Sequence, residues 1–68
     1  MATVNISLKA ARANADMTQR EWAEKLNVTV DTVLNWETGK SEPKLSQLRQ
    51  ISELSGIPMD FIFVPMKS

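Results

Sequence analysis

The stretch 29–38 carries the side chains best suited to contacting a partner. Read as a helix, it turns Val33 and Trp36 toward one side. The side chains that point the other way are Val30, Asp31, Leu34, Asn35 and Thr38. Two aliphatic groups, a carboxylate, an amide and a hydroxyl can read base edges in a major groove, whereas a purely solvated face would carry Lys and Glu. Solvated residues on a small domain remain the alternative interpretation.

The composition argues against an enzyme and against a metal site. The 68 residues include no Cys and no His, which removes thiolate ligands, disulfides and the commonest general base. The sequence also shows no Gly-rich phosphate loop and no paired carboxylates in an evident pocket. We therefore expect no catalytic residue, metal, cofactor or small-molecule substrate.

Length and charge set further bounds. A chain of 68 residues forms one domain at most, and so short a chain buries only about 60% of its unfolded surface. Eight acidic residues balance eight basic ones and the pI is about 6.1, whereas strongly basic nucleic-acid binders exceed about 9. The sequence lacks a signal-peptide pattern and an apolar run of about 18 residues, so we expect a cytoplasmic protein with no membrane partner.

The apolar spacing predicts an all-α domain of five short helices without strands. A central helix should start at the N-cap Thr18, which has capping-box spacing to Glu21, and a second should start at the N-cap Thr29. Asn27 and Val28 form the turn between them, and Gly39 ends the second helix. Three further helices are expected at 6–15, 45–55 and 58–63.

The predicted core spans about 6–62 and leaves a short apolar tail at 63–68. Both tryptophans, Trp22 and Trp36, fall on inner stripes and should be buried. The other residues expected in the core include Leu8, Ala11, Ala15, Leu45, Leu48, Ile51, Leu54, Phe61 and Ile62.

These residues resemble a known family. The matching positions are Thr18-Gln19, Trp22-Ala23, Leu26-Asn27-Val28-Thr29, Val33, Trp36-Glu37-Thr38-Gly39-Lys40 and Pro43. The pattern resembles the Cro/CI-type helix-turn-helix repressors, also called the XRE family, over about 6–62. The resemblance implies a compact, lambda-repressor-like five-helix domain that binds operator DNA, usually as a dimer, with the helix 29–38 in the major groove.

The resemblance also assigns roles to single residues. It implies base reading by Val30, Asp31 and Asn35, to which the outward face adds Leu34. Polar or basic residues are common in the family where this chain has Val30 and Asp31. The resemblance implies further that Arg12 and Glu37 form a partly buried salt bridge.

Contacts to the DNA backbone come from a second set of residues. The resemblance implies that Gln19 holds a phosphate and braces the helix 29–38, and that Thr29, Thr38 and Lys40 touch the backbone. The proposed docking adds the basic residues Lys9, Arg20 and Lys44. All four basic side chains could equally be ordinary solubilising charges.

Two of the base-reading assignments have structural alternatives. Asp31 could accept from cytosine N4, or it could simply stabilise the helix dipole by about 0.3–1 kcal/mol. Val30 and Leu34 could contact thymine methyl groups, or they could be half-buried against a neighbouring element.

The apolar tail predicts a dimer contact, because exposed apolar clusters usually mark an interface. A short strand at Phe63 and Val64 could pair across the two-fold axis. The residues expected at this interface are Leu54, Ile57, Phe63, Val64 and Met66.

The sequence therefore predicts a sequence-specific DNA-binding transcriptional regulator. We expect a stand-alone, Cro/CI-like repressor of phage or prophage type that binds double-stranded DNA at a palindromic operator as a homodimer. The chain could also be the DNA-binding domain of a longer protein. The competing hypothesis is a helix-turn-helix module for protein interaction, such as an antitoxin or anti-repressor.

Overall fold

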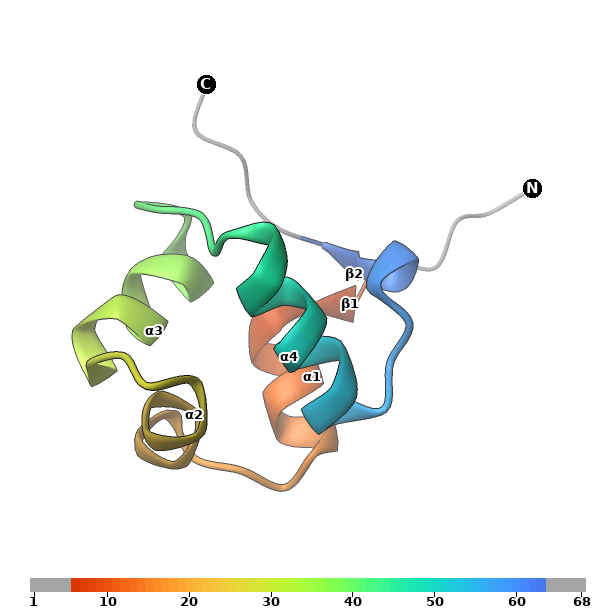
Figure 1. Ribbon diagram of the computed structural model, residues 1–68, viewed down its shortest axis with the longest axis horizontal. Helices are drawn as coiled ribbons and strands as arrows, with labels where there is room; N and C mark the ends of the chain where they lie inside the picture. Colours follow the sequence, from red (N-terminus) through yellow and green to blue (C-terminus); the bar gives the residue numbers. More distant parts are fainter. Residues whose placement is uncertain (1–5, 64–68) are drawn as a thin grey trace.

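Four α-helices and a short two-stranded sheet form the described part of the protein (Figure 1). The computed structural model describes residues 6–63. The elements in chain order are β1 (Ile6–Ser7), α1 (Leu8–Asn14), α2 (Gln19–Leu26), α3 (Val30–Thr38), α4 (Leu45–Ser55), the 3-10 turn η1 (Met59–Phe61) and β2 (Ile62–Phe63). In Figure 1, α2 and α3 lie together on one side and the sheet on the other, with α1 and α4 between them. No helix within 6–63 has the length and apolar character needed to span a membrane.

Side-chain caps set the starts of α2 and α3. Thr18 and Glu21 form a complete capping box, in which Thr18 Oγ1 accepts from the Glu21 N–H at 3.1 Å and Glu21 Oε1 accepts from the Thr18 N–H at 2.8 Å. Thr29 Oγ1 accepts from the Thr32 N–H at 3.1 Å. The predicted starts of both helices are therefore confirmed.

Left-handed residues end the same two helices. Asn27 has φ 58°, and the Val28 N–H then bonds the Ala23 carbonyl at 2.9 Å. Gly39 has φ 83°, and the Lys40 N–H bonds the Asn35 carbonyl at 2.9 Å. Only Asn27, Val28 and Thr29 separate α2 from α3, a length typical of a helix-turn-helix.

The predicted first helix, 6–15, is wrong at its start. Ser7 Oγ accepts from the Ala10 N–H at 3.0 Å, so Ser7 is the N-cap and the helix begins at Leu8. Ile6 and Ser7 are extended and pair in parallel with Ile62 and Phe63. The two paired segments are far apart in the sequence. A strand of two residues is also too short to show the alternating apolar pattern by which a strand is recognised.

The predicted fifth helix is also wrong, because 58–63 holds a single 3-10 turn, Met59–Phe61. Pro58 is extended, and the Phe61 N–H bonds the Pro58 carbonyl at 2.9 Å. Ile62 and Phe63 then leave the turn to pair with β1 of the same chain. The strand expected at Phe63 thus forms within the chain, while Val64 lies outside the described residues.

Among the residues whose burial is described, 6–62, nine buried hydrophobic residues form one core, namely Leu8, Ala11, Trp22, Ala23, Leu26, Val33, Trp36, Ile51 and Ile57. The prediction that both tryptophans are buried is confirmed. Two core predictions are wrong, because Leu45 is 61% exposed and Phe61 is 45% exposed. Leu45 stands at the first position of α4, before the buried stripe, and the short η1 turns Phe61 outward.

Two hydrogen bonds fix the end of α4, one to the end of α1 and one to the segment that follows α4. Asn14 Nδ2 donates to the Ser55 carbonyl at 3.3 Å, and Ser52 Oγ donates to the Ile57 carbonyl at 2.7 Å. Between them, Gly56 adopts φ 72°. The chain can therefore reverse direction and bring Ile57 into the core.

Substitution of Gly56 measures the free-energy cost of placing a residue with a side chain in the left-handed region at this position. A Cβ on Gly56 would meet no atom within 4 Å, so Gly56→Ala tests backbone conformation without a steric clash. We expect Gly56→Ala to lower the free energy of unfolding by about 1–2 kcal/mol in urea denaturation. Gly56→Asn should lose less, because asparagine tolerates the left-handed region. Equal stability of the Ala variant and the parent would contradict this account.

Candidate functional site

The α3 outward face, which we define as Val30, Asp31, Leu34 and Asn35, is accessible on the side of the helix away from the core. Val30 is 39% exposed and Leu34 is 44% exposed, whereas Val33 between them is fully buried. Asp31 is exposed and Asn35 is half-buried. The structure thus brings the four residues predicted to read bases onto one accessible face, and neither aliphatic side chain belongs to the core.

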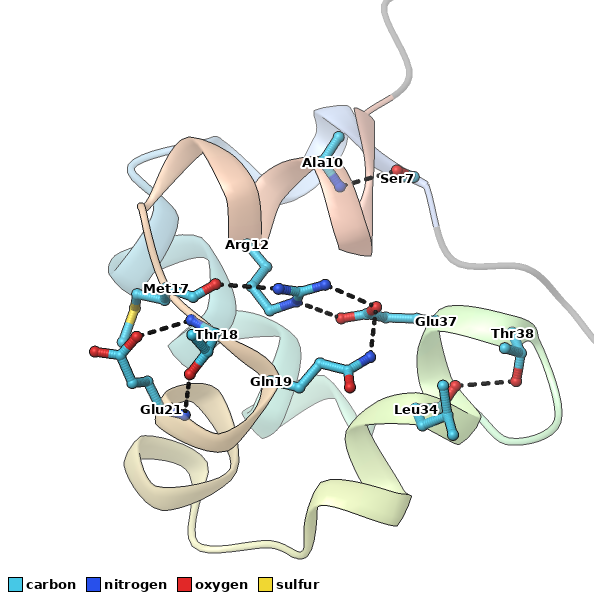
Figure 2. A network of polar contacts seen from close by, with 10 residues as sticks. All are labelled: Ser7, Ala10, Arg12, Met17, Thr18, Gln19, Glu21, Leu34, Glu37 and Thr38. Carbon is cyan, nitrogen blue, oxygen red and sulfur yellow. Dashed lines mark hydrogen bonds and ion pairs between the residues drawn. The ribbon is translucent and has the colours of Figure 1, made fainter.

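A polar network links the helix that carries this face to α1 and α2 (Figure 2). Arg12 Nε and Nη2 donate to Glu37 Oε2 and Oε1 at 2.7 and 3.2 Å, so the predicted ion pair is present and bidentate. Gln19 Nε2 donates to Glu37 Oε1 at 3.2 Å, and Arg12 Nη1 donates to the Met17 carbonyl at 3.1 Å. We call Arg12, Met17, Gln19 and Glu37 the Glu37 network.

The Glu37 network fixes the pose of α3. Its side chains are shielded from water, with exposed fractions of 15% for Arg12 and 6% for Glu37. The resemblance implied the ion pair and a link between Gln19 and α3, whereas the hydrogen bond from Arg12 to the Met17 carbonyl was not anticipated. An arginine has five N–H donors, and one carboxylate cannot accept from all of them. A second acceptor for Arg12 could therefore have been expected.

The hydroxyl groups of α3 and its cap are engaged within the helix. Thr38 Oγ1 donates to the Leu34 carbonyl at 2.9 Å (Figure 2). Thr29 Oγ1 and Thr32 Oγ1 share a hydrogen bond of 2.9 Å. A phosphate contact from Thr38 would require its hydroxyl to rotate away from Leu34. Sequence reasoning did not anticipate Thr32 as the partner of Thr29.

The predicted backbone-binding cations are spread over three segments. Lys9 lies on α1, Arg20 lies on α2, and Lys40 and Lys44 lie in the loop after α3, all of them exposed. Glu42 lies between the two loop lysines, so the loop keeps a net positive charge of one. Gln19 is the first residue of α2, next to Arg20.

The residues expected at a dimer interface are less favourably placed. Ile57 is 8% exposed and belongs to the core, so its side chain offers little surface to a partner. Leu54 is half-buried and lines a shallow hollow of about 220 Å³ with Lys25, Gln50 and Glu53. The side chain of Phe63, together with Val64 and Met66, lies outside the described residues.

Clustered acidic side chains are not part of this site. Within 6–63, no three Asp or Glu side chains come together in a way that could hold a metal ion, and the sequence has no His or Cys to add.

Comparison with known proteins assigns the chain to a family. The helix-turn-helix family designated HTH_3 matches residues 8–62, which spans α1 to the first residue of β2. The chain belongs to the XRE-type helix-turn-helix family. The resemblance found in the sequence is therefore confirmed.

Three helix-turn-helix relatives illustrate the match. The HTH-type transcriptional regulator ImmR of Bacillus subtilis is 36% identical over 55 residues, which cover 81% of this chain and 43% of ImmR. The HTH-type transcriptional activator BcrR of Enterococcus faecalis is 32% identical over 56 residues, or 82% of this chain and 28% of BcrR. An uncharacterised HTH-type transcriptional regulator of Methanocaldococcus jannaschii is 35% identical over 57 residues, or 84% of this chain and 86% of that protein.

The helix-turn-helix chain spans less than half the length of ImmR and of BcrR. No solved structure shows a significant match to it.

Breaking the Glu37 network should destabilise the helix-turn-helix. Glu37→Ala leaves the Arg12 guanidinium partly buried without its carboxylate, which should cost about 3–5 kcal/mol of unfolding free energy. Glu24→Ala is the matched control, because Glu24 is exposed on α2, and it should change stability by less than about 0.5 kcal/mol.

The double variant Arg12→Met/Glu37→Met separates the effect of losing the charges from the effect of losing side-chain packing. Because it removes both charges together, the double variant should recover much of the stability in a urea titration. Glu37→Ala and Glu24→Ala variants of equal stability would show that the network does not hold α3.

Proposed function

We propose that this chain is a sequence-specific DNA-binding transcriptional regulator that places α3 in the major groove. The observation that carries the proposal is the α3 outward face on the second helix of a helix-turn-helix. Its residues are accessible while the opposite side of α3 is buried, and their groups match base edges. The relatives named as transcriptional regulators support the same function.

The start of α2 supports a phosphate contact beside α3. The capping box uses the N–H groups of Thr18 and Glu21, which leaves those of Gln19 and Arg20 at a positive helix end. The Gln19 side chain also bonds Glu37, so one residue would connect a phosphate to the helix that reads the bases. Lys9, Arg20, Lys40 and Lys44 would provide further backbone contacts.

Dimeric binding to a palindromic operator extends the proposal. A two-fold dimer presents two copies of α3 to half-sites about 34 Å apart, one turn of the duplex. Repression is the mode we propose, because a bound protein can block a promoter by occupancy alone. Leu54 and the residues after Phe63 remain the proposed dimer contact. The compartment proposed is the cytoplasm.

A protein-interaction module is the second candidate function. Asp31 favours it, because its carboxylate lies exposed on the α3 outward face, where it would repel DNA phosphates. The exposed Val30 and Leu34 beside it also suit a protein partner. On this hypothesis the chain acts as an antitoxin or anti-repressor, and α3 docks on another protein.

Selection from a random duplex pool separates the two functions. A DNA-binding regulator should enrich a palindrome whose binding weakens steeply with salt. Sedimentation of the enriched complex should give two chains per duplex if the dimer is correct. Absence of enrichment, with no duplex binding even at low salt, would rule out the DNA-binding proposal and favour protein docking.

Asn35 should contribute to sequence preference. An outward asparagine can form a bidentate contact with adenine N6 and N7, which is worth about 1–3 kcal/mol of discrimination. Asn35→Ala should therefore lose discrimination between the enriched duplex and a scrambled one, while weak, salt-sensitive binding persists. The measurement is competitive binding by fluorescence anisotropy. An unchanged preference would remove Asn35 from the base-reading set.

The loop lysines should contribute to salt dependence rather than to preference. Removing one lysine that neutralises a phosphate should make the log–log salt slope shallower by about 0.9. Lys40→Ala and Lys44→Ala should each show this change. Lys25→Ala is a matched control, because Lys25 lies beside Gln50 and Glu53 of α4. If all three variants give the same slope as the parent protein, the loop does not touch the backbone.

A further inference from the structure

The hydrogen-bond donors of α3 are unusually few. Its sequence, VDTVLNWET, contains no Lys and no Arg. The hydroxyl proton of Thr38 is used on the Leu34 carbonyl, and a single hydrogen bond between the hydroxyls of Thr29 and Thr32 uses the proton of one of them. Asn35 has the one side-chain amide of the helix, and its O and NH₂ together suit adenine, which offers an acceptor and a donor.

Guanine is the base that such a helix reads worst. Its major-groove edge presents the two acceptors N7 and O6, which are usually contacted by an arginine or a lysine. The α3 outward face instead places the Asp31 carboxylate, which has only acceptors when ionised, among its residues. Two acceptors facing each other repel, so Asp31 should disfavour guanine on the strand that its carboxylate faces, whereas cytosine N4 would be an acceptable partner.

The α3 outward face is best suited to apolar contacts. Val30 and Leu34 lie one helical turn apart, and each leaves about four tenths of its surface open to solvent, at 39% and 44%. The major groove has one apolar group that varies with sequence, the C5 methyl group of thymine. A methyl group placed between these two side chains would bury apolar surface from both sides.

We propose that α3 recognises its half-site chiefly through thymine methyl groups, which Val30 and Leu34 contact, while Asp31 disfavours guanine on the strand that its carboxylate faces. This proposal rests on the proposed DNA-binding function and names the base chemistry that the same site selects.

Removing single methyl groups from DNA tests the proposal directly. The enriched duplex is synthesised with 2′-deoxyuridine in place of thymidine, one position at a time, which deletes the methyl group and keeps base pairing. Deoxyuridine at a contacted position should weaken binding of the duplex about fourfold, the value expected for the loss of one buried methyl group. Deoxyuridine in the flanks of the duplex is the control and should leave the affinity unchanged.

Variants of α3 assign the effect to particular side chains. Leu34→Ala or Val30→Ala should bind the thymidine duplex more weakly and show less than half of the deoxyuridine penalty. Asn35→Ala should keep the full penalty, because its contact is to adenine. Selection with Asp31→Asn should enrich guanine at positions from which the parent protein excludes it, since the amide adds donors.

The outcomes separate this proposal from the one on which it rests. Enrichment of a duplex whose affinity is unchanged by deoxyuridine at every position would overturn methyl reading and leave the DNA-binding function standing. A half-site without thymine at the positions beneath α3 would do the same. If no duplex binds at low salt, both proposals fall together.

Discussion

The ion pair between Arg12 and Glu37 is the interaction on which the geometry of the helix-turn-helix depends. It joins α1 to α3, and Gln19 adds α2 through the same carboxylate. A shielded ion pair contributes little net stability, because desolvation offsets much of the attraction. The ion pair instead fixes the orientation of α3, because a bidentate contact of 2.7 and 3.2 Å tolerates little rotation of the helix. The three helices are therefore held in one relative pose.

Once α3 is held in this way, its two sides can serve separate purposes. Val33 and Trp36 contribute to the core, and Thr29 and Gly39 close the helix ends. None of the four residues of the α3 outward face belongs to the core, so we expect most substitutions there to cost little stability. A helix built in this way can change its partner by a few substitutions on one side.

The sequence predicts most where structure is local. Thr18, Thr29, Asn27 and Gly39 mark helix ends within four residues of the groups they bond, and each was predicted correctly. The two ends of the described part, near Ile6 and after Pro58, are predicted poorly. Ile6 reads as the first residue of a helix until Ile62, far along the chain, supplies its pairing partner. The segment after Pro58 is also too short for its apolar spacing to distinguish a single 3-10 turn from a helix.

The candidate site shows the same division. Periodicity placed Val30, Asp31, Leu34 and Asn35 on one face, because a helix fixes the direction of each side chain. It could not show that the hydroxyl of Thr38 bonds the Leu34 carbonyl, since rotamers depend on the local backbone. That difference alters the chemistry of the face, because a hydroxyl bonded within the helix adds no free donor. The net charge of the chain is zero, so the proposed DNA binding would depend on where the individual cations lie, and its sequence preference on the few groups that α3 leaves exposed.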